Sequence, residues 1–495
     1  MNDNAKKYLK FRETYKDFIY EGYTAKDNND TLDITYHFSI PGLERFEPVW
    51  SFSRIDSRLS DFNSKLPAFN SHKADTSSQQ ATDNLIQTAI NSQFKTVNPK
   101  CLERLIFSLG MVELISYWKT CCPPNVRIEA GALSADQISW WKKLYFHGLG
   151  EFFYLNGIVP NDDFMSINCP LTLTCISELA PSTANYHSKL PNVLIPIGGG
   201  KDSALTLELL RESAERYAYI INPRPATVNT VAVSGLGSDR LITAKRTLDK
   251  NMLRLNTKGY LNGHTPFSAI VAFSSVLSGY LNGMDYVALS NESSANESTV
   301  AGSDVNHQYS KSFEFETDFR KYEKKNIASG VEYFSLLRPL LELQIARNFA
   351  RHKQYHSIFQ SCNRSEKTNE WCGVCPKCLF VYVILSPFLD ESELADIFHK
   401  DLYEDTLLID TLDELAGFTP EKPFECVGRR DEVKTALELV ISKYTNDNKQ
   451  LPPLLAHYKM MSEEINDSSE ILTYFDDNNA VPNRFISLVR GAALV

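Results

Sequence analysis

The chain has 495 residues, of which 43% are hydrophobic, 23% charged and 11% aromatic, a composition typical of a globular protein with about two to four domains. Its formal net charge of −10 gives no overall attraction to a polyanion, which argues against a protein that binds nucleic acid or an anionic membrane. The ten cysteines are too few for a disulfide-stapled secreted scaffold, and the first residues lack the apolar core of a signal peptide. No apolar run is long enough to span a bilayer, so we expect a cytoplasmic protein without a membrane segment.

The N-terminal part of the chain predicts an α+β domain over residues 1–185. Alternating apolar and polar residues between 32 and 52 predict the strands of a small sheet. A polar stretch between about 70 and 100 predicts an exposed insertion, and apolar residues at helical spacing from 102 to 118 predict a helix. A second polar stretch, at 180–191, marks the expected domain boundary. Substrate recognition is the expected role of this domain.

After this boundary, short apolar runs alternate with helical patterns. Strands are predicted at 193–197, 219–223 and 286–290, and helices from 203 to about 217 and from 267 to 281. Strands that alternate with helices are typical of a parallel, doubly wound α/β sheet. We therefore predict a second domain over residues 186–495, with a cysteine-rich segment at 362–378 and a C-terminal helical extension.

The strand predicted at 193–197 enters the run Gly198-Gly199-Gly200-Lys201-Asp202-Ser203, which opens the following helix. Glycines let backbone N–H groups converge on phosphate oxygens, and the N-terminus of a helix adds partial positive charge. Lys201 can add a point charge, Asp202 can help to hold Mg²⁺, and Ser203 can cap the helix or donate to a phosphate. The run predicts a phosphate-binding turn, and a purely structural glycine turn is the alternative.

Two common nucleotide-binding motifs do not fit this run. A Walker A loop is excluded because Asp202 follows the lysine and no glycine lies five residues before Gly200, and the dinucleotide pattern G-x-G-x-x-G is absent. The run resembles instead the Ser-Gly-Gly-x-Asp-Ser signature of PP-loop ATP pyrophosphatases, with Gly198 in the place of the first serine. The resemblance implies that ATP and Mg²⁺ are bound, that ATP is split into AMP and diphosphate, and that a carboxylate or carbonyl oxygen is adenylated. The missing hydroxyl removes one phosphate contact.

Four of the ten cysteines lie within one short segment, at Cys362, Cys372, Cys375 and Cys378. A structural Zn²⁺ takes four thiolates in a tetrahedron, and the two-residue spacings form the tight knuckle of such sites. An iron–sulfur cluster is the rival, but the ferredoxin pattern continues with a downstream cysteine, whereas the fourth cysteine here lies upstream. The spacing therefore favours structural zinc over an iron–sulfur cluster, and both over unliganded thiols.

A longer series of short runs extends in order from residue 115 to residue 428. The runs are ISYWK at 115–119, GLGEF at 148–152, PIGGGKDS at 196–203, NGHTP at 262–266, SNESSA at 290–295, VNHQYSKS at 305–312, YFSLLRP at 333–339, SCNR at 361–364, WCGVCPKC at 371–378 and KPFECVG at 422–428. This series resembles the MurL family, the ATP-dependent UDP-N-acetylmuramoyl-L-alanyl-L-glutamate epimerases of peptidoglycan synthesis. The resemblance implies a PP-loop fold, a UDP-MurNAc-dipeptide as the small-molecule substrate, and neither a nucleic acid nor a membrane as partner.

The implied reaction adenylates the α-carboxylate of the terminal L-Glu, removes its α-proton, returns a proton on the other face and hydrolyses the adenylate. Inversion requires proton transfer on both faces of the carbon. The candidates are His307, Lys311 and His264, with Tyr309 behind them. Residues 306–311 form a dense polar string that follows the strand end Ser290-Asn291-Glu292. Ligands in open α/β sheets lie beyond the carboxyl ends of strands, so we expect both segments at the rim of the site. A hydrogen-bonded structural histidine is the alternative for His307 and for His264.

Three arginines are candidates for binding the diphosphate or the side-chain carboxylate of the substrate, namely Arg338, Arg347 and Arg364. Solvated or helix-capping arginines are the alternative.

Two rival interpretations of the chain remain open. A PP-loop ligase or a tRNA- or nucleobase-modifying enzyme would capture the same adenylate with ammonia or sulfur. A sulfur-transfer enzyme needs a reactive thiol outside the cysteine cluster, and Cys426 and Cys169 are available. A zinc-stabilised interaction protein with a degenerate loop is the non-enzymatic rival, and Gly198 is its only support.

Overall fold

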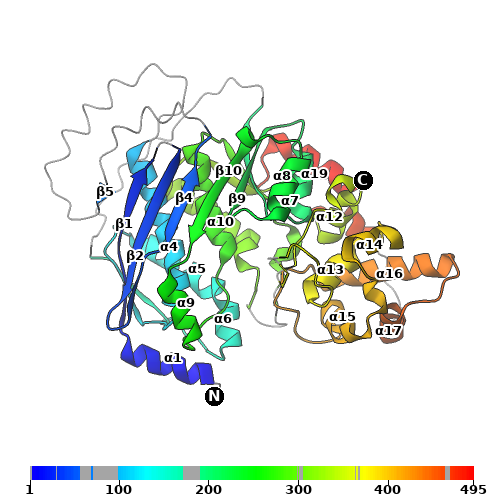
Figure 1. The fold of residues 1–495 in the computed structure, drawn as a ribbon, viewed down its shortest axis with the longest axis horizontal. Coiled ribbons are helices and arrows are strands. Elements are labelled where there is room, and N and C mark those ends of the chain that lie inside the picture. Colours follow the sequence, from blue (N-terminus) through cyan, green and yellow to red (C-terminus); the bar gives the residue numbers. More distant parts are fainter. Residues whose placement is uncertain are drawn as a thin grey trace. The chain divides into compact units, whose positions relative to one another are not determined.

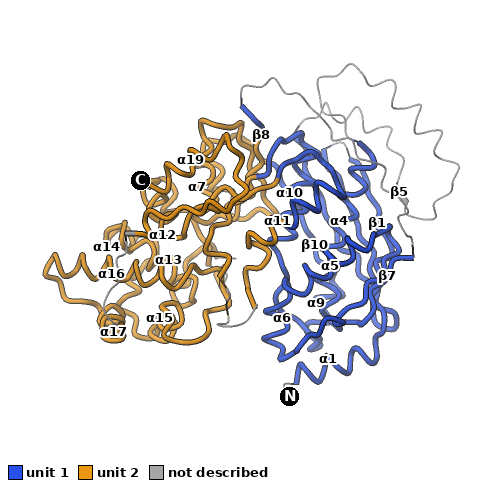
Figure 2. The backbone as a smooth tube through the Cα atoms, turned by 180° about the vertical axis from the view of Figure 1, so that it is seen from behind, with its two compact units in different colours: residues 1–192, 242–287, 318–332 blue, residues 193–241, 288–317, 333–495 orange. Residues whose placement is uncertain are grey.

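The computed structural model describes residues 3–28, 30–55, 69–70, 98–170, 190–297, 299, 305–362, 364–365, 368–462 and 469–494 (Figure 1). The chain forms two compact units: the first comprises 1–192, 242–287 and 318–332, and the second comprises 193–241, 288–317 and 333–495 (Figure 2). Each unit therefore combines segments that are far apart in the sequence. The domain boundary predicted at 185/186 and most of the insertion predicted at 70–100 lie outside the described residues. Within the described ranges, no helix has the length and apolar character needed to cross a membrane.

The sheet of the first unit accounts for the apolar alternation near the N-terminus. Its strands lie in the order β10-β4-β2-β1-β6-β7, with β3 beside β2 and β5 beside β1. β1 pairs antiparallel with β2, whereas β6 runs parallel to β1. On β2, alternate residues from Leu32 to Phe38 are buried and the residues between them are half-buried, which confirms the strands predicted in this region. The bounds are β1 (Asp17–Asp27), β2 (Thr31–Ile40), β3 (Glu44–Phe46), β4 (Val49–Ser53), β5 (Phe69–Asn70), β6 (Asn125–Ile128), β7 (Ser166–Asn168) and β10 (Leu241–Thr247).

Two apolar helices of the first unit pack against each other. α4 (Pro99–Trp118) is the helix predicted from 102 to 118, and it begins where Asn98 Oδ1 accepts from the amide of Lys100 at 3.0 Å. α10 (Phe267–Leu281) has the predicted bounds and packs against α4. The other helices of this unit are α1 (Asp3–Thr14), α5 (Ala135–Gly148), α6 (Gly150–Leu155), α9 (Lys250–Thr257) and the π-helical turn η6 (Glu323–Ile327), and α11 (Phe313–Tyr322) leads into η6.

A second set of strands flanks the glycine run, in the order β12-β11-β8-β9. The amide of Glu332 donates to the carbonyl of Asp285 at 2.9 Å, and that of Leu336 donates to Leu289 at 2.8 Å. The two strands therefore advance together and are parallel. The mixed α/β architecture with parallel strands agrees with the alternation of strands and helices in the sequence. The bounds are β8 (Asn192–Pro196), β9 (Glu215–Ile221), β11 (Tyr286–Leu289) and β12 (Glu332–Ser335).

The helix after the glycine run is shorter than predicted. α7 covers Lys201–Leu209, and β9 begins at Glu215, so the helix predicted from 203 to 217 is wrong in its second half. The residues that follow the turn, from Tyr217 to Ile221, are mostly aromatic and β-branched, and such side chains favour a strand over a helix. Residues 219–221 of the strand predicted at 219–223 form the end of this longer strand, which stops at Ile221.

The rest of the second unit is mainly helical and shares an apolar core in which α13 is almost entirely buried. Its helices are α8 (Pro225–Val233), α12 (Glu342–Phe349), α13 (Pro376–Leu385), α14 (Glu391–Phe398), α15 (Ile409–Ala416), α16 (Arg430–Asn446), α17 (Pro453–Met461), α18 (Ser469–Thr473) and α19 (Asn483–Leu494). Short 3₁₀ turns are η3 (Ser238–Arg240), η4 (Ser293–Asn296), η5 (Tyr309–Lys311), η7 (Lys353–Tyr355), η8 (Leu402–Glu404) and η9 (Thr406–Leu408).

A buried ion pair ties α4 to two strands of the first unit. Glu113 of α4 is fully buried, and its carboxylate accepts from Arg246 Nη2 of β10 at 2.8 Å. The same carboxylate accepts from Trp50 Nε1 of β4 at 3.2 Å. Trp50 and Arg246 are register partners of the β4–β10 ladder, so one carboxylate serves two neighbouring strands.

Glu113→Ala is expected to lower the free energy of unfolding by about 3–5 kcal/mol, because it leaves the buried Arg246 guanidinium without its counter-ion. Urea unfolding followed by circular dichroism measures the change. The matched control is Glu103→Ala on an exposed position of the same helix, with an expected effect within about 0.5 kcal/mol. Equal effects of the two variants would contradict the assignment.

Candidate active site

The turn between β8 and α7 contains the three consecutive glycines. Gly200 is the N-cap of α7, and no side chain caps the helix at this end. The Ser203 hydroxyl donates to the carbonyl of Gly200 at 3.1 Å and therefore does not accept from the first amides of the helix. Amides at an uncapped helix N-terminus, together with the helix dipole, attract an anion. The turn can therefore bind a phosphate.

Only one of the first two glycines is required by the backbone. Gly199 has φ +85°, and a Cβ there would lie 2.9 Å from the Cβ of Ala226. Its carbonyl accepts from the amide of Gln360 at 2.9 Å. A Cβ at Gly198 would meet no atom within 4 Å. The position that carries serine in PP-loop enzymes therefore has room for a side chain.

Three carboxylates from separate elements of the second unit converge at the start of α7. They belong to Asp202 in α7, to Glu292 after β11 and to Glu342 at the start of α12, and one oxygen of each lies within 4.8 Å of the others. Glu292 and Glu342 are buried, and Lys201 forms ion pairs with Asp202 and Glu342. Hard oxygen ligands at this spacing suit Mg²⁺.

Burial and the nearby lysines have opposite effects on the pKa values of these carboxyl groups. Burial raises the pKa of Glu342 to about 7 against the attraction of Lys201. Burial also raises the pKa of Glu292. At Asp202, burial acts in the same direction, but the charge of Lys201 and of more distant lysines outweighs it and lowers the pKa. A divalent cation among these oxygens would favour the ionised form of all three carboxylates.

A fourth carboxyl group lies behind the cluster and fixes its position. Glu432 is fully buried and accepts from the Ser294 hydroxyl at 2.6 Å and from the amide of Leu343 at 3.0 Å. The same hydroxyl accepts from the amide of Glu342 at 3.4 Å. The backbone at the start of α12 is therefore held from behind.

Arg338 fixes the backbone of two site residues. It is fully buried, and its Nη2 lies 3.1 Å from Glu316 Oε2. It also donates to the carbonyls of Glu292 and Lys311. Because the guanidinium is occupied inside the protein, the expected role of Arg338 in binding a substrate is replaced by a structural one. The structure places the other two candidates differently: Arg347 donates to the carbonyl of Ala493 at 2.8 Å, and Arg364 is exposed.

Two predicted proton-transfer residues, His307 and Lys311, converge on Cys426. His307 Nε2 lies 3.8 Å from Cys426 Sγ, and the Lys311 ammonium interacts electrostatically with the same thiol. The amide of His307 donates to Thr299 Oγ1 at 3.0 Å, which fixes the backbone before η5. Tyr309, which was expected behind them, is buried.

The third predicted proton-transfer residue, His264, belongs to the first unit. Its Nδ1 lies 3.1 Å from Glu151 Oε2. The next residue, Thr265, accepts from Lys119 Nζ at 2.6 Å, and the same ammonium donates to the carbonyl of Gly263. Burial lowers the pKa of Lys119 to about 8. The buried Lys119 ammonium therefore holds the loop that carries His264. The His264 imidazole and the Glu151 carboxylate form a pair that can exchange a proton.

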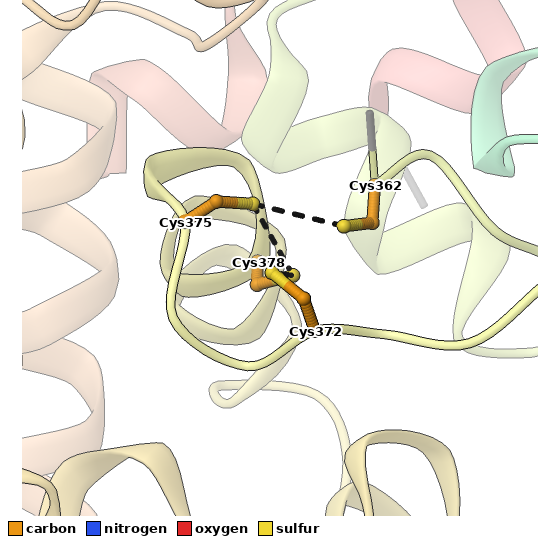
Figure 3. A group of neighbouring side chains, drawn as sticks. All are labelled: Cys362, Cys372, Cys375 and Cys378. Carbon is orange, nitrogen blue, oxygen red and sulfur yellow. Dashed lines mark hydrogen bonds between the residues drawn. The ribbon is translucent and has the colours of Figure 1, made fainter. Parts of the chain in front are cut away.

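The four clustered cysteines form a compact group between α12 and the start of α13 (Figure 3). The Sγ atoms of Cys362 and Cys375 are 3.8 Å apart, those of Cys372 and Cys378 are 3.7 Å apart, and those of Cys375 and Cys378 are 3.5 Å apart. A tetrahedron with Zn–S bonds of about 2.3 Å has edges of about 3.8 Å. The geometry therefore fits a four-thiolate metal site, which would leave no open coordination position.

Two residues of this site, Glu342 and Cys426, were not among the predicted site residues. Glu292 was expected only as a rim residue at the end of its strand, without a role. Glu342 begins a helix that carries no sequence motif, and only the tertiary fold brings it to Asp202. Cys426 was considered only as a reserve thiol for sulfur transfer, and its proximity to His307 follows from the fold alone.

Comparison with known proteins gives a consistent result. Residues 68–336 match the family model of the MurL N-terminal domain, and residues 358–470 match that of the MurL C-terminal domain. A UDP-N-acetyl-alpha-D-muramoyl-L-alanyl-L-glutamate epimerase from Xanthomonas oryzae pv. oryzae is 34% identical over 366 residues, which cover 70% of this chain and 76% of the relative. Relatives of the same name from Salinispora tropica and Micromonospora sp. are each 34% identical and cover 68% of this chain, with 73% and 75% of their own lengths matched. No solved structure matches the chain.

Gly199→Ala is expected to lower the free energy of unfolding by about 1–3 kcal/mol, because the added Cβ meets Ala226 and the backbone is left-handed. Gly198→Ala is the matched control, with an expected effect within about 0.5 kcal/mol, because its Cβ enters open space. Chemical denaturation of both variants compares the two positions. A larger loss for the Gly198 variant than for the Gly199 variant would refute this description of the turn.

Proposed function

The chain belongs to the MurL family, and from this premise we propose that it is an ATP-dependent epimerase. Its substrate is UDP-MurNAc-L-Ala-L-Glu, the terminal L-Glu of which it converts to D-Glu for peptidoglycan synthesis. ATP is split into AMP and diphosphate as the glutamyl α-carboxylate is adenylated. The observation that carries the proposal is the uncapped N-terminus of α7 next to three converging carboxylates.

The turn from Gly198 to Gly200 supplies the phosphate contacts. The first amides of α7 and the ammonium of Lys201 present positive charge toward the same turn. Lys201 pairs with Asp202 and Glu342, and these ion pairs hold its charge at the start of α7. Asp202, Glu292 and Glu342 would hold Mg²⁺, which when bound neutralises phosphate charge.

Adenylation makes the α-proton removable. A carbanion next to an ionised carboxylate would place two negative charges side by side, so the α-carbon of glutamate is a very weak acid. Attachment of AMP removes the carboxylate charge and leaves a carbonyl oxygen that can accept the electron pair of the broken C–H bond. Proton transfer on each face then inverts the centre. The groups available are the His307, Lys311 and Cys426 set of the second unit and the His264 and Glu151 pair of the first unit.

The cysteine cluster has a structural role in this proposal. Cys362, Cys372, Cys375 and Cys378 would hold one Zn²⁺, and their sulfur spacings fit a tetrahedral site. The cluster lies where α13 begins, so the metal would stabilise the segment between α12 and the apolar core. Free energy of metal binding at such a site becomes free energy of folding.

A sulfur-transferring PP-loop enzyme is the second candidate, and one observation favours it. The thiol of Cys426 has a lowered pKa and therefore has the reactivity that sulfur transfer requires. This enzyme would release AMP with an acceptor nucleobase and would not exchange an α-proton.

In D₂O, the protein is expected to incorporate deuterium at the glutamyl α-carbon only when ATP and Mg²⁺ are both present. Lys201→Ala and Asp202→Ala should each lower diphosphate release and deuterium uptake by about 100-fold or more, because each removes a charge that binds the phosphates or the cation. Glu212→Ala, at an exposed position beyond α7, is the control with unchanged rates. Diphosphate assays and proton NMR of the product measure the two quantities.

Uptake of deuterium without ATP would rule out activation by adenylation. Diphosphate release at the parent rate in either loop variant would place the phosphates elsewhere. Release of AMP without any α-proton exchange would favour the sulfur-transfer enzyme.

The purified protein is expected to contain one zinc ion per chain. Cys375→Ser should lose the metal and lower the free energy of unfolding by about 4 kcal/mol or more, because the remaining thiolates cannot complete the tetrahedron. Cys169→Ser, outside the cluster, is the control and should keep the metal. Elemental analysis and denaturation measure both effects, and iron with a visible absorption band, or no metal at all, would contradict the zinc assignment.

A further inference from the structure

The thiol of Cys426 lies among cations. Its Sγ is 3.8 Å from His307 Nε2, and the charge of the Lys311 ammonium acts on the same sulfur. Lys377 donates to the backbone carbonyl of Cys426 and adds a further positive charge nearby. Cys426 and His307 are both half-buried, so a small molecule can reach them.

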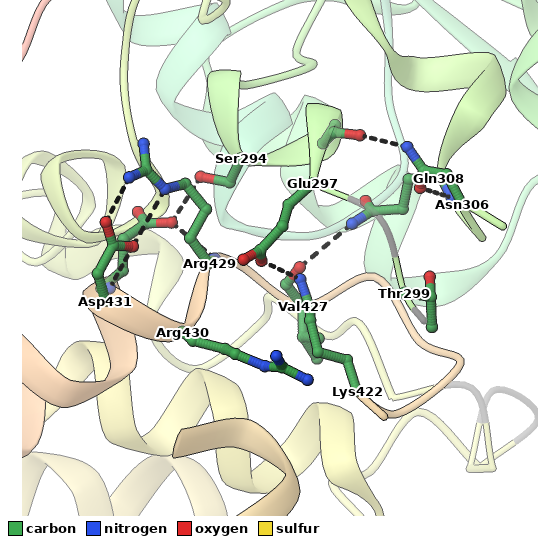
Figure 4. A network of polar contacts seen from close by, with 12 residues as sticks. Ser294, Glu297, Thr299, Asn306, Gln308, Lys422, Val427, Arg429, Arg430 and Asp431 are labelled. Carbon is green, nitrogen blue, oxygen red and sulfur yellow. Dashed lines mark hydrogen bonds and ion pairs between the residues drawn. The ribbon is translucent and has the colours of Figure 1, made fainter. Parts of the chain in front are cut away.

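Several polar contacts hold the two segments that carry this pair (Figure 4). Lys422 Nζ lies 2.6 Å from Glu297 Oε2, and Gln308 Nε2 donates to the carbonyl of Val427 at 3.2 Å. Asn306 Nδ2 donates to the carbonyl of Ala295 at 3.0 Å. Because contacts exist on both sides of His307 and of Cys426, the thiol and the imidazole are held at a defined separation.

The neighbouring cations give the thiol of Cys426 a lower pKa than that of the buried Cys121. Burial acts to raise the pKa of Cys426, but Lys311, His307 and Lys377 overcome it and lower the pKa to about 6. At Cys121, burial dominates and raises the pKa to about 12. At neutral pH, Cys426 is therefore mainly a thiolate, which is the basic and nucleophilic form of the side chain.

We propose that Cys426 is the base that removes and returns the α-proton on one face of the activated glutamyl residue, with His307 and Lys311 as positioning residues. This inference rests on the proposed epimerase function. In the step, the α-C–H bond breaks, an S–H bond forms, and the electron pair moves to the carbonyl oxygen. The electron pair then returns from the oxygen and forms a new C–H bond with a proton that a second acid delivers to the opposite face. The thiol finally loses its proton to solvent water through His307.

This assignment changes the roles first expected of two residues. Lys311 is an ammonium ion at neutral pH and stabilises the thiolate, so it does not take the α-proton. His307 directs Nε2 at the sulfur and can carry the proton away from it. The adenylate already activates the carboxylate, and a second covalent activation by sulfur is not needed. A proton-transfer group on each face is needed, and a thiolate beside an imidazole provides one.

The first test measures deuterium uptake from D₂O relative to AMP release, for the L- and D-glutamyl substrates separately. Cys426→Ala should lower this ratio by about 100-fold or more for one isomer, because it removes a general base. Cys426→Ser tests the same step with a side chain of similar size. Cys169→Ala is the matched control and should leave the ratio unchanged. Circular dichroism of each variant checks that it folds.

An unchanged ratio for both isomers in the Cys426 variants would overturn the proposal. Loss of AMP release in proportion to exchange would also overturn it, because the thiol would then act before proton transfer. A trapped acyl-enzyme at Cys426 would assign it a nucleophilic role and would equally exclude the role of base. If the parent protein shows neither AMP release nor exchange, the proposed function itself fails.

The second test measures alkylation of Cys426 by iodoacetamide as a function of pH, with the modified residue located by mass spectrometry. The rate should rise through pH 6 and then level off, because the thiolate is present above its pKa, whereas an ordinary thiol titrates near pH 8.5. His307→Gln and Lys311→Met should move the midpoint upward, and substrate with ATP should slow the reaction. A midpoint near pH 8.5 in the parent protein would contradict the assignment.

Discussion

The second unit depends on negative charge that is buried and held by the protein's own cations. Asp202, Glu292 and Glu342 come from separate elements, and carboxylates so close together repel one another unless cations or protons compensate them. Lys201 bridges two of them, and Arg338 fixes the backbone next to the third. Because each cation has a fixed partner, the turn before α7, the end of β11 and the start of α12 form one electrostatic network. A divalent cation bound there would add positive charge to that of Lys201, which alone balances the three carboxylates only in part.

Much of the local structure was predictable from the sequence, because it depends on near neighbours. The glycine turn, the helix α10 and the cysteine cluster each follow from a few consecutive residues. The end of α7 was not predictable in this way, since the amphipathic pattern continued into residues that form β9. Glu342 and Cys426 are harder still, because their functional partners lie far away in the sequence and only the packing of strand ends brings them together. Motifs therefore predicted candidate residues, and only the fold shows which other side chains lie beside them.

The interleaving of the two units along the sequence also depends on contacts between residues that are far apart in the chain. β10 follows β9 in the chain, yet its partner in the first unit is β4, which the Trp50, Glu113 and Arg246 contacts tie to α4. The sequence of 241–247 does not indicate that this strand pairs with β4. The pairing of a strand depends on the side chains of the neighbouring strands as much as on its own. The N-terminal family model runs from 68 to 336 and thus includes segments of both units.

The cysteines show how one residue type acquires three roles from its surroundings. Burial keeps Cys121 protonated, because a thiolate there would lose its hydration without compensation. Three neighbouring sulfurs would make Cys375 a metal ligand, since several thiolates can share one site only if a cation lies between them. Lysine and histidine side chains around Cys426 stabilise its thiolate without a metal, which leaves the sulfur lone pairs available for a proton. The number of cysteines in the sequence does not distinguish these cases. The charge and identity of the nearest side chains distinguish them. For Cys426, two of these side chains are His307 and Lys311, which belong to the polar string that the sequence analysis named as a source of proton-transfer groups.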